Sequence, residues 1–123
     1  MLDSSAVLAF LNGETGSDTV QANLAQAVIS TVNVAEVVTR LARAGNGREA
    51  VQQVLRILDL DVIDLDGDLA EATGMLVAKT GPAGLSLGDR ACLALAAREA
   101  LPVLTADRAW SKVDVGVEIR LLR

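Results

Sequence analysis

The chain has 123 residues, of which 51% are hydrophobic and 22% charged, and its formal net charge is −5. This length suffices for one domain with a buried core, so we expect a single domain over residues 1–123. Histidine and tyrosine are absent, which excludes Ser-His-Asp and Cys-His catalysis, His-ligated zinc sites and phenolic nucleophiles. The single cysteine, Cys92, excludes an internal disulfide and a multi-cysteine zinc site. Catalysis would therefore need carboxylates, hydroxyls, basic side chains or a bound metal.

The composition also constrains location and ligands. Phe10 and Trp110 are the only aromatic residues, which argues against a single-strand binder built from several stacking platforms. We interpret Trp110 as a packing anchor. The first residues lack the basic and apolar regions of a signal peptide, and no stretch is apolar enough to span a membrane. We therefore expect a cytoplasmic protein with no membrane association.

In chain order, short apolar strands alternate with helical patterns. The first half predicts a short strand at Leu2, a helix ending near residue 12, a helix from 17 to 24, a strand over 27–30 and a helix over 31–44. The second half predicts a helix over 46–58, a strand over 62–65, a helix over 66–80, a helix over 87–100, and strands over 102–105 and 117–121. This alternation predicts an α/β fold, a three-layer α/β/α sandwich with a short, mainly parallel central sheet.

Cap residues set the expected helix boundaries. Ser17 is suited to cap the second helix, and Asp66 the helix that follows the strand over 62–65. Asn46, with Glu49 three residues later, fits a capping box. The helix over 87–100 is apolar on every side between Arg90 and Arg98, which predicts that it is buried and that Cys92 is an inert, structural thiol.

Four of the acids stand in unusual positions. Asp3 and Asp107 directly follow predicted strands, and sites in open α/β sheets form beyond the carboxyl ends of the strands. Asp89 shares a helix face with apolar residues, and Glu36 lies within the apolar run 32–38. A carboxylate in such surroundings is costly unless it is paired or binds a metal.

Structural roles are the alternative. Asp89 would then favour a helix N-terminus, Glu36 would pair with Arg40 four residues later, and Asp3 and Asp107 would be turn residues. If the four acids instead converge, the chemistry they support without a histidine is divalent-metal catalysis, because Mg²⁺ and Mn²⁺ prefer oxygen ligands. A bound metal orients a water molecule and stabilises charge on a phosphate, which suits phosphodiester hydrolysis.

At these residues the chain resembles the PIN-domain family and, within it, the VapC-type toxin ribonucleases. The resemblance covers almost the whole chain and is carried by residues 2–8, 29–37, 85–96 and 102–110. It implies that acids matching Asp3, Glu36, Asp89 and Asp107 surround the metal site. In this interpretation Asp3, Asp89 and Asp107 hold the metal, while Glu36 binds a second metal or orients water.

The resemblance also implies a function and partners. Residues matching Ser5 and Thr105 support the acids. The implied activity is an Mg²⁺- or Mn²⁺-dependent endoribonuclease, with RNA as substrate, an antitoxin protein as partner and a homodimeric assembly. Some family members carry a further acid where this chain has Ala109, a departure that bears on whether one or two metals are held.

Basic residues near the acids have two interpretations. Arg40 and Arg43 follow Glu36 by four and seven residues, which places all three on one helix face. They would contact RNA phosphates, or they belong to a solvated face. Without the four candidate acids the formal charge of the chain is −1, so its acidity does not exclude RNA.

Two other functions remain open at the level of the sequence. One is a non-catalytic interaction module with the same fold, although retention of all four acids counts against it. The other is a metal-dependent phosphatase that acts on small phosphoesters. Assays with RNA and with a small phosphoester distinguish them.

Overall fold

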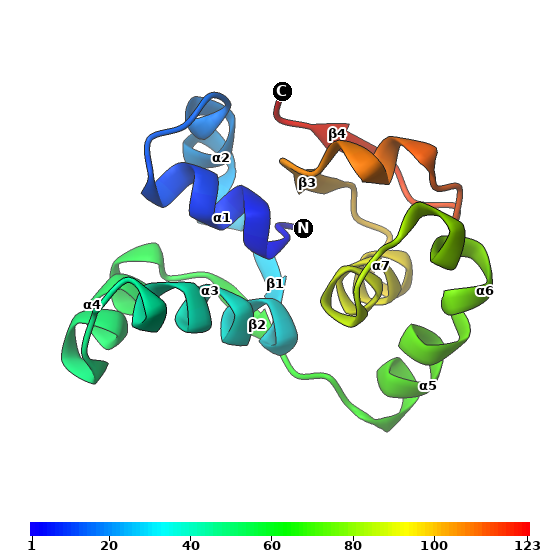
Figure 1. The fold of residues 1–123 in the computed structure, drawn as a ribbon, viewed down its shortest axis with the longest axis horizontal. Coiled ribbons are helices and arrows are strands. Elements are labelled where there is room, and N and C mark those ends of the chain that lie inside the picture. The colour runs from blue at the N-terminus through cyan, green and yellow to red at the C-terminus, as the bar shows by residue number, and fades with distance from the viewer.

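The computed structural model describes residues 1–123 and consists mainly of helices around short strands (Figure 1). The helices are α1 Ser4–Leu11, α2 Ser17–Asn23, α3 Thr31–Arg43, α4 Arg48–Leu58, α5 Gly67–Met75, α6 Val77–Thr80 and α7 Leu87–Glu99. The strands are β1 Val28–Ser30, β2 Asp61–Ile63, β3 Val103–Thr105 and β4 Ile119–Leu121. Short 3₁₀ helices cover Leu24–Gln26, Gly81–Ala83 and Arg108–Lys112.

The N-terminal residues join two parallel strand pairs. β1 pairs with β2 and β3 pairs with β4, both in parallel. The Leu2 N–H donates to the Val28 carbonyl at 3.0 Å, and the Asp3 N–H donates to the Leu104 carbonyl at 3.3 Å. The spatial order is therefore β2, β1, residues 1–3, β3, β4, and this arrangement confirms the parallel sheet.

Neighbouring residues of these strands pack into two different hydrophobic clusters, because side chains alternate between the faces of a sheet. Leu2, Ile29 and Leu104 pack with α1 and with parts of α2, α3 and α4. Their neighbours on the other face pack around α7, with the fully buried Trp110; these are Met1, Val28 and Val103. The sheet thus separates two apolar layers, which confirms the three-layer α/β fold.

Helix α7 is the buried element of the second layer. Its residues 91–96 are all buried, as the apolar run predicted. Ser86 caps the helix, and the Ser86 hydroxyl and the Asp89 carboxylate each accept a backbone N–H of the other residue. Burial raises the pKa of the Cys92 thiol well above its usual range, which agrees with an inert cysteine.

Two expected helix caps are wrong. The N-cap of α2 is Gly16, with a φ of +94°, and Ser17 is already helical. The N-cap of α4 is Gly47, and the expected capping box of Asn46 and Glu49 is absent. The Asn46 side chain instead donates to the carbonyl of Leu41 at 2.9 Å, so it closes the end of α3.

The helix expected over residues 66–80 is interrupted at Leu76. Asp66 caps α5 as expected and accepts the Leu69 N–H at 2.8 Å. The Arg90 guanidinium lies 3.2 Å from the Thr73 carbonyl and 3.4 Å from the Gly74 carbonyl, and donates to both. A continuous helix would use these two carbonyls for its next turn, so a tertiary contact competes with the helix.

Two strands differ in extent from the expectation. β2 ends at Ile63 rather than residue 65, and Val62 is 45% exposed because β2 lies at the edge of the sheet. β4 begins at Ile119 rather than residue 117. None of the helices has the length and apolar character that a membrane span requires.

Candidate functional site

Asp3 lies where the N-terminal strand segment ends and α1 begins. Its carboxylate caps α1 by accepting the Ala6 N–H at 2.8 Å. The Thr105 hydroxyl donates to it at 2.7 Å, and the Ser5 hydroxyl lies 2.8 Å from both of its oxygens. Only 2% of Asp3 is exposed. The structure therefore places Ser5 and Thr105 as direct supports of Asp3.

The pKa of Asp3 is raised from 3.8 to about 6. Burial is the main cause, and the charge of Asp89 adds to it. The hydrogen bonds from Thr105, Ala6 and Ser5 oppose the increase, because they favour the charged form. Asp3 is thus a buried carboxylate whose charge is only partly compensated.

Asp89 lies in the first turn of α7, where it accepts the Ser86 N–H at 2.8 Å. Burial raises its pKa, the Ser86 contacts lower it, and the charges of Glu36 and Asp107 raise it further. Asp89 is therefore both a helix cap and a member of an acidic cluster. It interacts electrostatically with each of the other three candidate acids.

Glu36 extends from α3 and is held by two donors. The Ser4 hydroxyl donates to its Oε2 at 2.6 Å, and the Asn33 amide donates to the same oxygen at 2.9 Å. No ion pair joins Glu36 to Arg40. The alternative explanation of Glu36, pairing with the residue four positions later, is therefore wrong.

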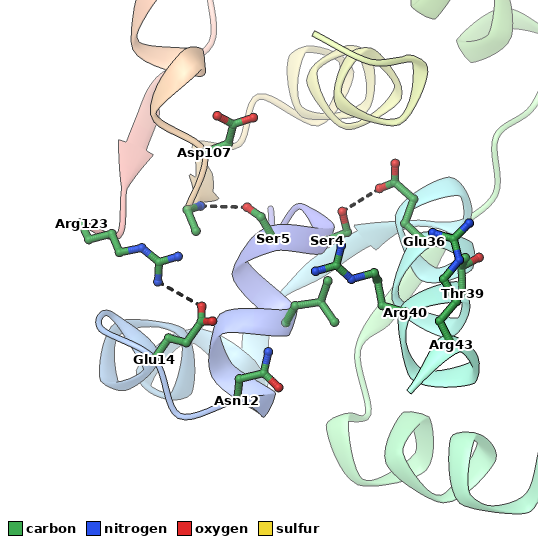
Figure 2. Close-up of a pocket in the computed structure, with 12 residues that line it drawn as sticks. Ser4, Ser5, Asn12, Glu14, Glu36, Thr39, Arg40, Arg43, Asp107 and Arg123 are labelled. Atoms are coloured by element: carbon green, nitrogen blue, oxygen red, sulfur yellow. Dashed lines mark hydrogen bonds and ion pairs between the residues drawn. The ribbon is translucent and has the colours of Figure 1, made fainter. Parts of the chain in front are cut away.

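Asp107 follows β3 and caps the 3₁₀ helix by accepting the Ala109 N–H at 2.9 Å. Its own N–H donates to the Thr105 hydroxyl at 3.0 Å. That hydroxyl therefore links the backbone of Asp107 to the carboxylate of Asp3. Figure 2 shows that the carboxylates of Asp107 and Glu36 extend from different elements, and both residues line the same pocket.

This pocket has a volume of about 500 Å³ and lies between α1, α3 and the segment after β3 (Figure 2). Glu36 and Asp107 line it together with Arg40 and Arg43, neither of which has an ion pair. The pocket also includes Arg123, which pairs with Glu14 at 3.1 Å. It therefore joins acidic and basic side chains in one space.

Several of these residues are not among the candidates that the sequence predicts. Asn33 lies three positions before Glu36 on a predicted helix, a spacing that could have marked it as a neighbour. Ser4 directly precedes Ser5, but no pattern in the sequence indicates that its hydroxyl contacts Glu36. Glu14 and Arg123 are 109 positions apart, so only the tertiary structure brings them together.

The donor set is suited to a hard divalent cation, because every candidate ligand is a carboxylate oxygen. Burial is the main cause of the raised pKa values of Asp3 and Asp89, and the charges of neighbouring acids raise them further. No three acids or cysteines lie close enough together to form a metal-binding group in this structure. The acids thus share one electrostatic environment without a ligating arrangement.

The sequence model of the PIN domain matches residues 1–116. The chain belongs to the PIN domain family. No curated protein matches the chain significantly in sequence. The family membership confirms the resemblance detected in the sequence.

Solved structures share the PIN fold over almost the whole chain. VapBC2 from Rickettsia felis, bound to a DNA fragment from its promoter, is 18% identical, with a TM-score of 0.73 and coverage of 98% of this chain and 96% of that chain. A toxin–antitoxin complex from Klebsiella pneumoniae is 21% identical, with a TM-score of 0.71 and coverage of 99% and 96%. VapC20 from Mycobacterium tuberculosis, a toxin that cleaves the sarcin-ricin loop, is 20% identical, with a TM-score of 0.67 and coverage of 89% and 91%.

Proposed function

We propose that this PIN domain protein is a divalent-metal-dependent endoribonuclease and the toxin of a toxin–antitoxin pair. The observation that carries the proposal is the environment of Asp3, a buried carboxylate at the strand ends that two hydroxyls hold in place. Its charge adds to those of three further acids, which a purely structural turn residue does not require.

The residues take distinct roles in this proposal. Asp3, Asp89 and Asp107 would hold Mg²⁺ or Mn²⁺, and Glu36 would hold a second ion or orient the attacking water. Ser5 and Thr105 orient the Asp3 carboxylate, as their contacts of 2.7–2.8 Å indicate. When bound, the metal lowers the pKa of a water molecule and stabilises charge on the phosphate.

The substrate in this proposal is single-stranded or looped RNA. The pocket contains the arginines Arg40 and Arg43, whose charges no acid of the chain neutralises by pairing. They are suited to bind phosphates on one side of the bond that is cleaved. A recessed site of this kind needs an unpaired strand, because the bases of a duplex are not accessible there.

The partners follow from the similar proteins. The structures from Rickettsia felis and Klebsiella pneumoniae are toxin–antitoxin complexes, which supports a cognate antitoxin for this chain. A basic side chain of the antitoxin would compensate the acids as a metal does. We include a homodimeric assembly and a cytoplasmic location in the proposal.

The test compares three substrates, RNA, single-stranded DNA and a small phosphoester, with Mn²⁺ and with EDTA. We expect cleavage of RNA that both EDTA and Asp3→Asn abolish. Hydrolysis of the small phosphoester alone would instead assign a phosphatase. No hydrolysis of any substrate would assign a non-catalytic interaction module. Cleavage of RNA that persists undiminished in EDTA would contradict the metal mechanism.

A further inference from the structure

The carboxylate of Glu36 occupies the space beside Gly88, at the start of α7. A methyl group added at Gly88 would overlap Oε1 of Glu36 and crowd its other carboxylate atoms. No other glycine of the chain lies against a candidate site acid in this way. The absence of a side chain at residue 88 is therefore a condition for the observed position of Glu36.

Local backbone geometry does not explain this glycine. Gly88 is helical, and its φ lies outside the left-handed region that favours glycine. Glycine inside a helix costs about 1 kcal/mol relative to alanine. Gly74 in α5 makes the contrast, because a methyl group there would meet open space. Contact with Glu36 is thus the physical reason for glycine at residue 88.

Asn33 holds the same carboxylate by a hydrogen bond. Its side chain is fully buried, and its Nδ2 donates to Glu36 Oε2 at 2.9 Å and to the Gly88 carbonyl at 3.2 Å. Both partners accept hydrogen bonds, so the position requires a side chain with two donors on one atom. Asn33 therefore connects Glu36 and α7 directly.

Three elements thus determine where Glu36 points. Helix α3 supplies Glu36 and Asn33, α1 supplies the hydroxyl of Ser4, and α7 supplies the free space at Gly88. The same turn of α7 carries Asp89, whose pKa the charge of Glu36 raises. The contacts hold the Glu36 carboxylate next to the acid of α7 instead of toward Arg40.

We propose that Gly88 and Asn33 are positioning residues for Glu36. Gly88 leaves the volume that the carboxylate occupies, and Asn33 fixes its rotation and ties it to α7. The inference rests on the proposed metal-dependent nuclease, in which Glu36 binds a second ion or orients water. The orientation of the Glu36 carboxylate would then depend on two residues that do not touch the substrate.

The variant that tests the role of Gly88 is Gly88→Ala, with Gly74→Ala as its matched control. Both replacements favour the helix, so Gly74→Ala is expected to melt at or above the wild type. Gly88→Ala is expected to melt lower than Gly74→Ala, because displacement of Glu36 breaks its hydrogen bonds to Ser4 and Asn33. Gly88→Ala is expected to fold because the overlapping atoms are the end of a flexible side chain, which can rotate away. Only Gly88→Ala displaces the Glu36 carboxylate.

We expect Gly88→Ala to lower kcat for RNA cleavage at least tenfold, with KM for RNA within twofold of the wild type. It also shifts the Mn²⁺ dependence of cleavage to higher concentration. Gly74→Ala behaves as the wild type in both assays. Equal kcat values in the two variants would overturn the inference while leaving the nuclease proposal intact. A wild type without RNA cleavage would overturn the nuclease proposal.

A crystal structure of Gly88→Ala provides a readout independent of activity. The expected result is a Glu36 side chain rotated away from residue 88, and an unmoved carboxylate would contradict the inference. Asn33→Leu removes the donors at similar size and is expected to give the same kinetic change. The double variant is expected to be no worse than either single variant, since both act through Glu36. Losses that multiply in the double variant would assign the two residues separate roles.

Discussion

At the scale of single residues, the environment of Asp3 is the strongest indication of a functional site. It combines the role of a helix cap with nearly complete burial, and its donors come from α1 and β3. An ordinary cap is exposed to water and keeps a low pKa. Asp3 instead has a pKa of about 6, so its protonation couples the site to the stability of the fold.

The pH dependence of stability tests this environment. The folded state raises the pKa of Asp3 from 3.8 to about 6, so between these values it retains a proton that the unfolded chain has lost. The metal-free protein is therefore expected to lose about 2 kcal/mol of stability from this group as the pH rises from 4 to 6. The measurement is urea unfolding across this range in EDTA.

Asp3→Asn is the reference for that measurement, because it removes the titrating group. Its stability is expected to fall less steeply with pH than that of the wild type between pH 4 and 6. Parallel curves for the two proteins would show that Asp3 titrates near its ordinary value in the fold.

Arg40 and Arg43 allow a second test at this scale. Both line the pocket without an acid partner, so Arg40→Ala and Arg43→Ala are expected to raise KM for RNA several-fold with little change in kcat. The control is Arg56→Ala on α4, outside the pocket. Wild-type kinetics in the two pocket variants would assign these arginines to a solvated face.

At the scale of elements, the start of α2 packs closely against the segment that follows β4. Gly16 has a φ of +94°, and a methyl group there would lie 2.7 Å from the Cβ of Leu122 and 2.9 Å from its carbonyl oxygen. Glycine is therefore required twice, for its backbone conformation and for the close approach of the segment after β4. The Leu122 N–H in turn donates to the backbone carbonyl of Thr105 at 2.9 Å, so the segment after β4 is hydrogen-bonded to β3.

Gly16→Ala is expected to destabilise the fold more than Gly13→Ala, its matched control. Gly13 also has a positive φ, of +65°, but a methyl group there would meet no atom within 4 Å. The control thus carries the cost of the left-handed backbone, on the order of 1 kcal/mol, and Gly16→Ala adds the overlap with Leu122. Urea unfolding of both variants measures the difference, and equal losses would contradict the close approach.

At the scale of the whole molecule, the proposed metal site would link metal binding to stability. Three of its acids come from α3, α7 and the segment after β3, and Asp3 starts α1. Their mutual repulsion opposes folding, and a divalent cation bound only by the folded state would relieve it. In this proposal, metal binding at the acids would therefore raise the stability of the fold.

Mn²⁺ is accordingly expected to raise the melting temperature. At a concentration about ten times Kd, the stabilisation is about 1.4 kcal/mol, which corresponds to several degrees. Asp89→Asn keeps an oxygen that can accept the Ser86 N–H, so it is expected to fold and to lose most of the shift. The control is Asp68→Asn, an exposed acid of α5. Thermal melts in which the two variants respond equally to Mn²⁺ would exclude Asp89 from the metal site.

The class of fold is predictable from local patterns in the sequence. Short apolar stretches separated by helical patterns predicted the parallel sheet and its helical layers, because hydrophobic periodicity is a local property of the chain. The apolar run within α7 and the cap residue Asp66 were also predicted, since burial and capping leave local signals. The same local patterns, with the family resemblance, identified Asp3, Asp89, Asp107 and Glu36 as candidates.

The tertiary structure decided what those residues contact. Arg90 donates to two carbonyls at the end of α5, where the local pattern predicts a continuous helix. Glu36 turns to Ser4 of α1 rather than to Arg40, since a donor from another helix is in reach only after the chain has folded. The space at Gly88 likewise depends on two helices meeting. Such pairings cost chain entropy that only the assembled core repays, so no local pattern specifies them.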